Sequence, residues 1–352
     1  MTNIEARTES WEIIEPTWWT GTPALDAESY VVDCAPFDTA AELVNGSDLA
    51  VTARATYHDR GLVHFVNTGL TDYGDMRRLA RLVLDAEMDY QGGANNRGRL
   101  QPNVFEIGAP LTAWLHYHHE MAYVGESPTA LAFLAGKVAP GKGATFVADN
   151  LRATEAILAT ELGRKLRDLG ISYHRDLTDR EAYEGRDQAG VYNHWQQSFG
   201  TDDPSLAEER AQAKGLVTEW DDDRLLRTRH DASAFEYFPQ LDRNVLFSSV
   251  ADHWMWFDAW PNVSHLAPHE RPLRMTYGDG SELTHDELRD YVEIYDRFGT
   301  PIDWRVGDVA VVCNYRFAHG RPGIHLAPGE ERELGVVLGA TFERIGDLPE
   351  RW

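Results

Sequence analysis

Hydrophobic residues occur in short runs along most of the chain, and most of these runs have the length and composition of β-strands. Each is rich in Val, Ala, Leu, Ile or Phe and is bounded by Gly, Pro, Asp or Asn, which is typical of strands that end in turns. Two neighbouring runs, residues 130–140 and 143–149, predict a hairpin within one sheet. Many strands without an internal repeat predict a jelly roll, in which two antiparallel sheets pack face to face. The other predicted strands are residues 29–35, 48–56, 61–69, 304–314 and 333–343.

Helical periodicity marks fewer segments. Residues 76–87 place their leucines and valine near one side of a helix. Residues 284–298 begin with Thr284 and carry Glu287 three positions later, the signature of a capping box at a helix start. Further helices are predicted for residues 150–170 and 204–214. We therefore expect a mainly β protein with flanking helices.

The segment 150–244 differs from the rest of the chain. After the helix at its start it is polar, charged and poor in strand signals. Because strand-type runs resume after it, we interpret it as an insertion between core strands of a single domain, residues 1–352. We expect this insertion to form part of a pocket or a lid. The Gly- and Asn-rich residues 92–98 suit either a flexible connector or a lid over an active site.

The composition argues against several function classes. The chain has 352 residues, and its formal net charge of −24 would repel a polyphosphate, which argues against nucleic-acid binding. Cys34 and Cys313 are the only cysteines, so neither a disulfide framework nor a thiolate zinc site is predicted. No apolar run approaches the roughly 18 residues of a membrane span, and the start lacks a signal-peptide pattern. We expect a cytoplasmic protein without membrane contact; the oligomeric state is open.

Candidate metal ligands lie in residues 115–123, LHYHHEMAY. Side chains alternate along a strand, so His118 and Glu120 would share one face with His116. His319, in the later segment NYRFAHGR, offers a third ligand. Two imidazoles and one carboxylate on one side of an octahedral ion form the facial triad of non-haem Fe(II) oxygenases. His116 in place of His118 is an alternative, and histidines that only fill a surface or core are another.

The order of several segments resembles a known family. HHEMAY, GATFVADN, YNHWQQSFGT and DWRVGDVAVVCNYRFAHGR, followed by Arg332, are similar to segments of the TauD/TfdA superfamily of Fe(II)/2-oxoglutarate-dependent dioxygenases. The likeness is closer to the branch of clavaminate synthase-like proteins and syringomycin-type hydroxylases, whose metal carboxylate is often the Glu of an H-x-E pair. It covers roughly residues 92–342. The fold it implies is a double-stranded β-helix, the jelly roll of cupin-like proteins.

The resemblance implies roles for individual residues. His118 and Glu120 match the H-x-E pair and His319 the distal metal histidine, with Fe(II), 2-oxoglutarate and O₂ as metal, cosubstrate and oxidant. Thr145 falls where the family places a hydroxyl group on 2-oxoglutarate. Arg332 falls where it places an arginine on the far carboxylate, which a planar guanidinium can bind through two parallel hydrogen bonds. Cys313, where the family usually has an acidic residue, removes no metal ligand.

The function that the resemblance implies is that of an oxidoreductase in natural product biosynthesis. We expect hydroxylation of an unactivated carbon of a small amino-acid-like metabolite, free or tethered to a carrier protein, while 2-oxoglutarate becomes succinate. Desaturation, epoxidation or cyclisation are alternatives, and the carboxylate of Glu120 argues against halogenation. A non-catalytic cupin-like binding protein and a zinc hydrolase are alternatives of other classes. The candidates for substrate contact are Tyr123, Trp195, Gln196 and Arg321, with structural anchoring as the alternative for Arg321.

Overall fold

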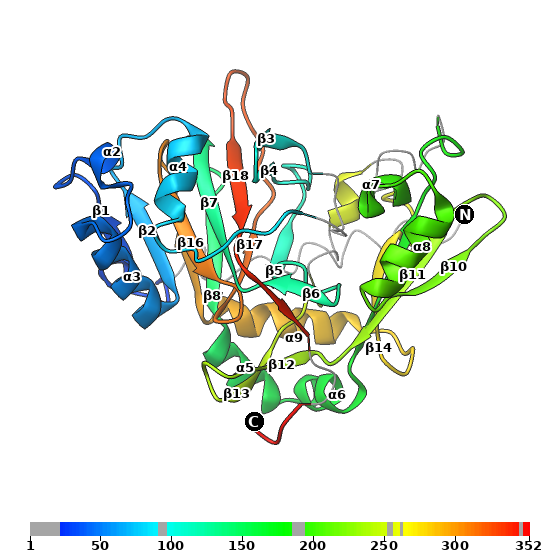
Figure 1. Ribbon diagram of the computed structural model, residues 1–352. Helices are drawn as coiled ribbons and strands as arrows, with labels where there is room; N and C mark the ends of the chain where they lie inside the picture. The colour runs from blue at the N-terminus through cyan, green and yellow to red at the C-terminus, as the bar shows by residue number, and fades with distance from the viewer. Residues whose placement is uncertain (1–21, 91–96, 185–193, 252–255, 261–262, 345–347) are drawn as a thin grey trace.

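Two sheets that face each other build the centre of the molecule (Figure 1). The computed structural model describes residues 22–90, 97–184, 194–251, 256–260, 263–344 and 348–352. The larger sheet has seven strands in the order β1-β2-β16-β7-β18-β4-β3, and the smaller sheet has four in the order β15-β8-β17-β5. β1 and β2 pair in parallel, and the other neighbouring strands of these two sheets are antiparallel. Strands distant in the chain thus lie side by side, and the predicted jelly roll is confirmed.

The strands of the larger sheet are β1 (Val31–Asp33), β2 (Leu62–Val66), β3 (Arg99–Gln101), β4 (Val104–Glu106), β7 (Ala130–Lys137), β16 (Val309–Cys313) and β18 (Glu333–Leu338). Those of the smaller sheet are β5 (Leu115–His118), β8 (Thr145–Asp149), β15 (Gly299–Ile302) and β17 (Phe317–Arg321). Two strand pairs stand apart from them, β6 (Glu126–Pro128) with β19 (Thr341–Glu343) and β12 (Phe235–Phe238) with β13 (Arg243–Leu246).

The described α-helices are α2 (Thr39–Glu42), α3 (Asp48–Arg60), α4 (Tyr73–Ala80), α5 (Asn150–Leu158), α6 (Glu161–Leu169), α7 (Trp195–Phe199), α8 (Pro204–Ala213) and α9 (His285–Asp296). Short 3₁₀ helices are η2 (Ala27–Ser29), η3 (Trp256–Ala259) and η4 (Pro268–Glu270). None of the helices in the described part of the chain has the length and apolar character needed to cross a membrane.

The central strand β7 shows why its sequence is apolar on both faces. Leu131 and Phe133 point into the core between the two sheets, whereas Ala132 and Leu134 belong to a second core on the outer side of the larger sheet. That outer core includes residues of α3 and α4, which cover this face. Because both faces are covered, residues 130–135 are all apolar and buried, as is typical of doubly buried strands, and only the end of the strand, at Lys137, is exposed.

One predicted strand and one predicted strand pairing were wrong. Residues 48–56 belong to α3, which the hydroxyl group of Ser47 caps by accepting a hydrogen bond from an amide of the first turn and which ends at Gly61, with φ of +74°. Leu49 and Ala53 are buried at helical spacing. The expected hairpin of residues 130–140 and 143–149 is also wrong, since β7 and β8 lie in different sheets. The connection between them crosses from one sheet to the other.

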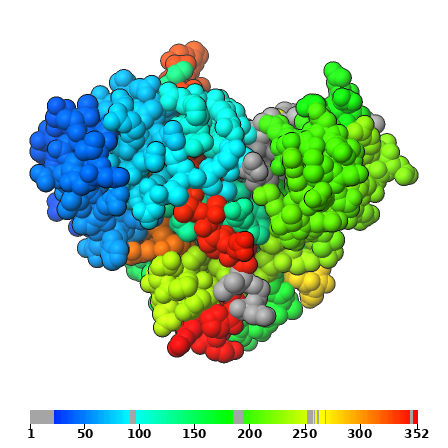
Figure 2. Space-filling view, in the orientation of Figure 1, coloured from blue at the N-terminus to red at the C-terminus, as the bar shows by residue number. Residues whose placement is uncertain are grey.

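The insertion 150–244 holds more strands than its polar sequence suggested. Its strands β9 (Ile171–Leu177), β10 (Val217–Trp220) and β11 (Leu226–Ala232) join β14 (Leu273–Tyr277), which follows the insertion, in a second four-stranded sheet with the order β10-β11-β9-β14. β9 alternates buried with half-buried residues at most positions, and charged side chains on its more open face hid the strand pattern. Figure 2 shows a notch between the lobe that contains α8, β10 and β11 and the N-terminal part of the molecule.

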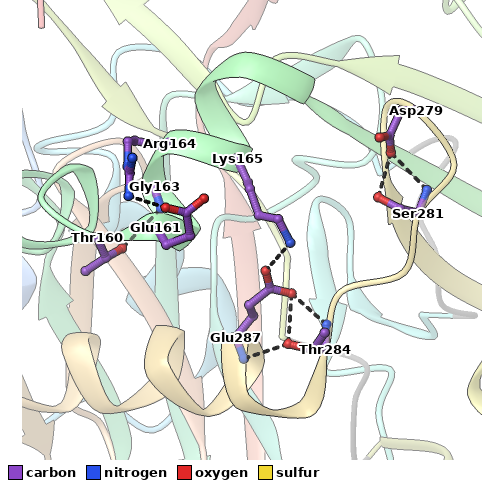
Figure 3. Close-up of polar contacts among 9 residues, drawn as sticks. All are labelled: Thr160, Glu161, Gly163, Arg164, Lys165, Asp279, Ser281, Thr284 and Glu287. Carbon is purple, nitrogen blue, oxygen red and sulfur yellow. Dashed lines mark hydrogen bonds and ion pairs between the residues drawn. The ribbon is translucent and has the colours of Figure 1, made fainter.

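Capping residues explain where the helices around the smaller sheet begin. The predicted capping box is confirmed: the Thr284 hydroxyl group accepts from the amide of Glu287, whose carboxylate accepts from the amide of Thr284 (Figure 3). Lys165 on α6 donates to the same carboxylate at 2.6 Å and thereby links α6 to α9. The single helix expected for residues 150–170 is divided, because Thr160 caps a new helix, α6. The helix predicted for residues 204–214 is α8.

We predict that His230, on β11, makes the fold less stable in mild acid. Burial lowers the pKa of His230 to about 4, from 6.5 for an exposed ring. Below about pH 6.5 the unfolded chain binds a proton here that the folded chain does not, so the free energy of unfolding falls with pH, by roughly 2 kcal/mol at pH 5. Urea unfolding measures this effect. Between pH 7.5 and pH 5 the free energy of unfolding should fall by roughly 2 kcal/mol less for His230→Phe than for the wild type. The exposed His269→Phe should keep the wild-type pH dependence, and equal losses in all three proteins would contradict the prediction.

Candidate metal centre

Strand pairing brings two of the expected ligands together. His118 on β5 and His319 on β17 are direct partners in the antiparallel register of the smaller sheet. Directly opposed residues have their Cβ atoms about 5 Å apart, so imidazoles on one face must meet. The ring centroids lie 4.3 Å apart. Tyr117, between the histidines of β5, points the other way and stacks on Tyr295 of α9.

Glu120 completes the group from a turn. β5 ends at His118, and the chain bends through Met121, whose φ is +57°. An oxygen atom of Glu120 lies 3.8 Å from Nε2 of His319. One potential ligand atom each from His118, Glu120 and His319 lies within 4.8 Å of the others, and all three residues are buried. His116, the alternative ligand, is buried outside this group, with its ring near that of Trp114.

The donor set fits a first-row divalent metal such as Fe(II). Two imidazole nitrogens and one carboxylate oxygen are the ligands of the facial triad. Nδ1 of His118 lies 2.8 Å from the carbonyl oxygen of His116; we assign the ring proton to this nitrogen, which leaves the lone pair of Nε2 for a metal. Burial, and next the charge of His118, hold the pKa of His319 well below its ordinary value. His319 is therefore a neutral ring, the form that binds metal ions.

The backbone around Glu120 is clamped by Asn314, which follows β16. The side-chain oxygen of Asn314 accepts from the amide of Glu120 at 2.8 Å, and its NH₂ group donates to the carbonyl of Glu120 at 3.0 Å and to that of Pro128 at 2.8 Å. Asn314 is fully buried, so its side-chain amide would destabilise the fold if it lacked these hydrogen bonds. Asn314 thus positions the carboxylate residue although it binds no metal itself.

The carboxylate of Glu120 has a cationic neighbour, Arg97. Nη2 of Arg97 donates to both carboxylate oxygens, at 2.9 and 3.2 Å. Burial lowers the pKa of Arg97, but the charge of Glu120 outweighs this effect and the pKa is raised above its ordinary value. Glu120 therefore lies beside a permanent cation.

Thr145, at the start of β8, lies in the same pocket with a defined hydrogen-bond role. Its Oγ1 accepts from Nε1 of the buried Trp304 at 3.1 Å. Because the indole N–H occupies a lone pair of the oxygen, the hydroxyl proton is left to donate to another group. Trp304 in turn packs edge-on against His64, which pairs with Asp308 at 3.3 Å. Trp304 is therefore a positioning residue for Thr145.

Since the family resemblance places the Thr145 hydroxyl group on 2-oxoglutarate, we predict that Trp304→Phe weakens 2-oxoglutarate binding. Loss of the indole donor frees the Thr145 hydroxyl group to rotate, and we expect the KM for 2-oxoglutarate to rise about five-fold, equivalent to roughly 1 kcal/mol, with kcat changed less. Steady-state kinetics of Trp304→Phe, Thr145→Val and the double variant form a cycle. If Trp304 acts through Thr145, the double variant matches Thr145→Val; fully additive effects would show that the two residues act independently.

Arg332, expected on the far carboxylate of 2-oxoglutarate, precedes β18 and is largely buried. Its Nε and Nη2 donate to the carbonyl oxygen of Gly143 at 3.1 and 3.0 Å. A Cβ atom at position 143 would lie 2.5 Å from Nε of Arg332, so only glycine permits this contact. Burial lowers the pKa of Arg332 to about 10, and no carboxylate of the described residues forms an ion pair with it. Arg332 is therefore a buried cation that contacts Gly143, two positions before Thr145, and it has no carboxylate counter-charge in the described part of the chain.

The pocket around the triad lies between the two sheets. Phe133 and Val336 of the larger sheet face His118, Thr145 and His319 of the smaller one. The pocket is lined by Arg97, Ile107, Leu115, His118, Glu120, Phe133, Thr145, His319, Gly320, Arg321 and Val336. These residues come from β5, β7, β8, β17 and β18 and from the segments beside them. Within the described chain, no lining residue belongs to the insertion 150–244.

The four substrate candidates are placed differently from the triad. Arg321 lines the pocket but donates to five backbone carbonyl groups, of residues 109–111, 113 and 322, which favours the anchoring role. Gln196 has both ends of its amide engaged, with the amide of Arg180 and the carboxylate of Asp179. Trp195 packs against Trp220 within the insertion. Tyr123 packs near Tyr173. These contacts give no support to substrate roles for Trp195, Gln196 or Tyr123.

Sequence reasoning missed three residues that support the site. Asn314 opens the segment NYRFAHGR and could have been considered as an anchor, but its contact with Glu120 spans 194 positions. Arg97 lies in the Gly- and Asn-rich loop 92–98, of which residues 92–96 lie outside the described chain, so the choice between connector and lid stays open. Trp304 carries no signal in the sequence beyond its position before a strand.

Comparison with known proteins agrees with this geometry. The model of the family "Taurine catabolism dioxygenase TauD, TfdA family" matches residues 22–338. A clavaminate synthase-like protein of Arabidopsis thaliana is 27% identical over 268 residues, which cover 75% of this chain and 78% of that protein. The dapdiamide synthesis protein DdaC of Enterobacter agglomerans is 24% identical over 280 residues, with the same coverage. A taurine dioxygenase structure from Burkholderia xenovorans has a similar fold, with a TM-score of 0.50 at 14% identity, covering 90% of this chain and 88% of that one.

Proposed function

Because the chain belongs to the TauD, TfdA family of dioxygenases, we propose that it hydroxylates an unactivated carbon of a small amino-acid-like metabolite. The protein is an oxidoreductase that depends on Fe(II) and 2-oxoglutarate and uses O₂. The observation that carries the proposal is the convergence of His118, Glu120 and His319 in a buried pocket. Two relatives bear the names of a clavaminate synthase-like protein and a dapdiamide synthesis protein, and these names support a small metabolite as the substrate.

We assign the metal ligands and the cosubstrate contacts as follows. His118, Glu120 and His319 hold Fe(II), the Thr145 hydroxyl group donates to 2-oxoglutarate, and Arg332 binds its far carboxylate. When bound, the metal and cosubstrate supply the oxidising power that removes hydrogen from a C–H bond. Each assigned side chain is fixed by a neighbour: His118 by the carbonyl of His116, Thr145 by Trp304, and Arg332 by Gly143.

The chain also shields the reaction from water. Phe133, Val336 and Ile107 supply apolar side chains to the pocket wall. The ring of Phe133 lies edge-on to His319, with centroids 5.6 Å apart. An apolar wall excludes water and strengthens the electrostatic interactions inside the pocket. We propose that the insertion 150–244 closes over this wall as a lid when substrate binds.

The experiment that tests the proposed function is an anaerobic titration with Fe(II) and 2-oxoglutarate. Wild-type protein should develop the weak visible charge-transfer band that a 2-oxo acid produces on Fe(II), and His118→Ala should not. After oxygen is admitted, a candidate substrate should stimulate conversion of 2-oxoglutarate to succinate. Absence of the band in wild-type protein would count against the proposed function. A band without succinate across a broad substrate panel would favour a cupin-like binding protein, and hydrolysis with Zn²⁺ would favour a zinc hydrolase.

The product distinguishes the related reactions. An alcohol that contains one atom from labelled O₂ supports hydroxylation, whereas an alkene, epoxide or ring would assign desaturation, epoxidation or cyclisation.

The cytoplasmic location and the possible carrier protein are expectations from the sequence. Cell fractionation tests the location, and assays with free and carrier-bound substrates test the need for a carrier protein.

A further inference from the structure

Arg97 places a buried cation in the metal pocket, beside the carboxylate of Glu120. Its side chain is 9% exposed and lines the pocket together with His118 and His319. The guanidinium carbon lies over the ring of Tyr90, 4.5 Å from its centroid, and this cation–π contact helps to hold the group in place. Nη2 is bound to Glu120. The orientation of Arg97 is thus set from two sides.

The other two nitrogen atoms of Arg97 have no acceptor in the described part of the chain. Nε and Nη1 are buried, and neither has a hydrogen-bond partner among the described residues. A guanidinium group has five N–H donors, and donors that carry charge are costly to leave unpaired away from water. An arginine kept only to orient Glu120 would need one nitrogen, and a lysine could perform that role. The free donors therefore point to a ligand with acceptor oxygens.

The charges in the pocket also favour a ligand that carries a negative charge. Arg97 and Arg332 are cations and Glu120 is an anion. Arg321, a third buried cation, donates to five backbone carbonyl groups and is left out of this count. A divalent metal and a doubly charged 2-oxoglutarate add no net charge, so one positive charge remains among these groups when both are bound. Arg332 would be matched by the far carboxylate of 2-oxoglutarate, while Glu120 would serve both the metal and Arg97. The uncompensated charge therefore lies at Arg97, and a buried cation that shares its counter-charge with a metal is unfavourable.

We infer that Arg97 binds a carboxylate of the substrate through its Nε and Nη1 side. This inference rests on the proposed function and narrows it, because an amino acid tethered to a carrier as a thioester has no free α-carboxylate. The substrate that fits is a free acid whose carboxylate lies at Arg97 and whose reacting carbon lies toward the triad. Arg97 is then the residue that selects acids over their neutral derivatives.

The test compares acids with their amides on the anaerobic Fe(II)/2-oxoglutarate complex. The probes are free L-amino acids and N-acyl amino acids, each paired with its own primary carboxamide, and binding is followed through the change in the visible band and through thermal shift. In wild-type protein the acids should bind at least about 10-fold more tightly than the amides, as expected for loss of a charge-assisted hydrogen-bond pair. Arg97→Gln should reduce this preference to about two-fold or less.

Arg99→Gln is the matched control, because Arg99 lies two positions away, is 53% exposed and pairs with Asp89 outside the pocket. It should keep the wild-type preference. An acid preference that persists in Arg97→Gln, or its absence in wild-type protein that forms the band, would overturn the assignment. Arg97→Gln could lose the band because Glu120 is displaced, and Arg97→Lys then provides the test because it keeps a cation beside Glu120. An unchanged preference for acids in Arg97→Lys overturns the inference, and a reduced preference supports it. No band in wild-type protein is a failure of the proposed function instead.

Discussion

His319→Ala is expected to lower kcat/KM for substrate-dependent succinate formation by roughly three orders of magnitude, about 4 kcal/mol of transition-state stabilisation. We propose that His319 supplies one of the three ligand atoms, and the pairing of β17 with β5 leaves no other described histidine in its place. The variant should also lose the Fe(II)/2-oxoglutarate band. Both quantities can be measured on the same anaerobically prepared protein.

His325→Ala provides the control for this experiment. His325 follows β17 in sequence but is exposed and outside the triad, so its removal should leave turnover and the band unchanged. Circular dichroism should show that both variants keep the fold. If His319→Ala turned over at the wild-type rate, the assignment of His319 as a metal ligand would be wrong.

Arg332→Met should have opposite effects on stability and on cosubstrate binding. Removing a guanidinium that binds 2-oxoglutarate should raise the KM for 2-oxoglutarate by about 10- to 100-fold, the range for loss of charge-assisted hydrogen bonds. Burial lowers the pKa of Arg332 to about 10, which shows that the protein environment disfavours this charge. We therefore expect the ligand-free variant to be at least as stable as the wild type while it loses the stabilisation that 2-oxoglutarate provides.

Thermal unfolding with and without 2-oxoglutarate measures both effects, and steady-state kinetics give the KM. Lys142→Met is the matched control, because Lys142 is the residue before Gly143 but pairs with Glu330 on the surface. It should keep a near wild-type KM. If Arg332→Met and Lys142→Met change the KM equally, a general loss of positive charge explains the effect and Arg332 has no specific role.

The sequence was informative where chemistry is concentrated in short segments. The H-x-E pair and the distal histidine could be named because imidazole and carboxylate are rare neighbours in apolar strands. The strand β17 and the register between His118 and His319 could not be predicted, because they depend on which distant strands pair with each other. Arg97 and Trp304 were missed for the same reason: each acts on a residue that is close only in the folded protein.

The errors in the predicted fold also have local causes. The β-branched residues Val51, Thr52 and Thr56 of α3 suggested a strand and concealed the cap at Ser47 and the stop at Gly61. In the insertion, charged residues on the open face of β9 and β11 obscured the alternation on their buried face. The predicted hairpin failed because two apolar strands close in sequence can face each other across a core instead of pairing within a sheet.

The clamp of Asn314 on Glu120 has a consequence for biosynthesis. The first two metal ligands leave the ribosome long before Asn314 and His319, which are synthesised almost 200 residues later. A nascent or truncated chain therefore carries His118 and Glu120 without the partners that orient them. We expect iron uptake to be a post-translational event that occurs only after the C-terminal strands have docked, so that an incomplete polypeptide does not present a redox-active metal.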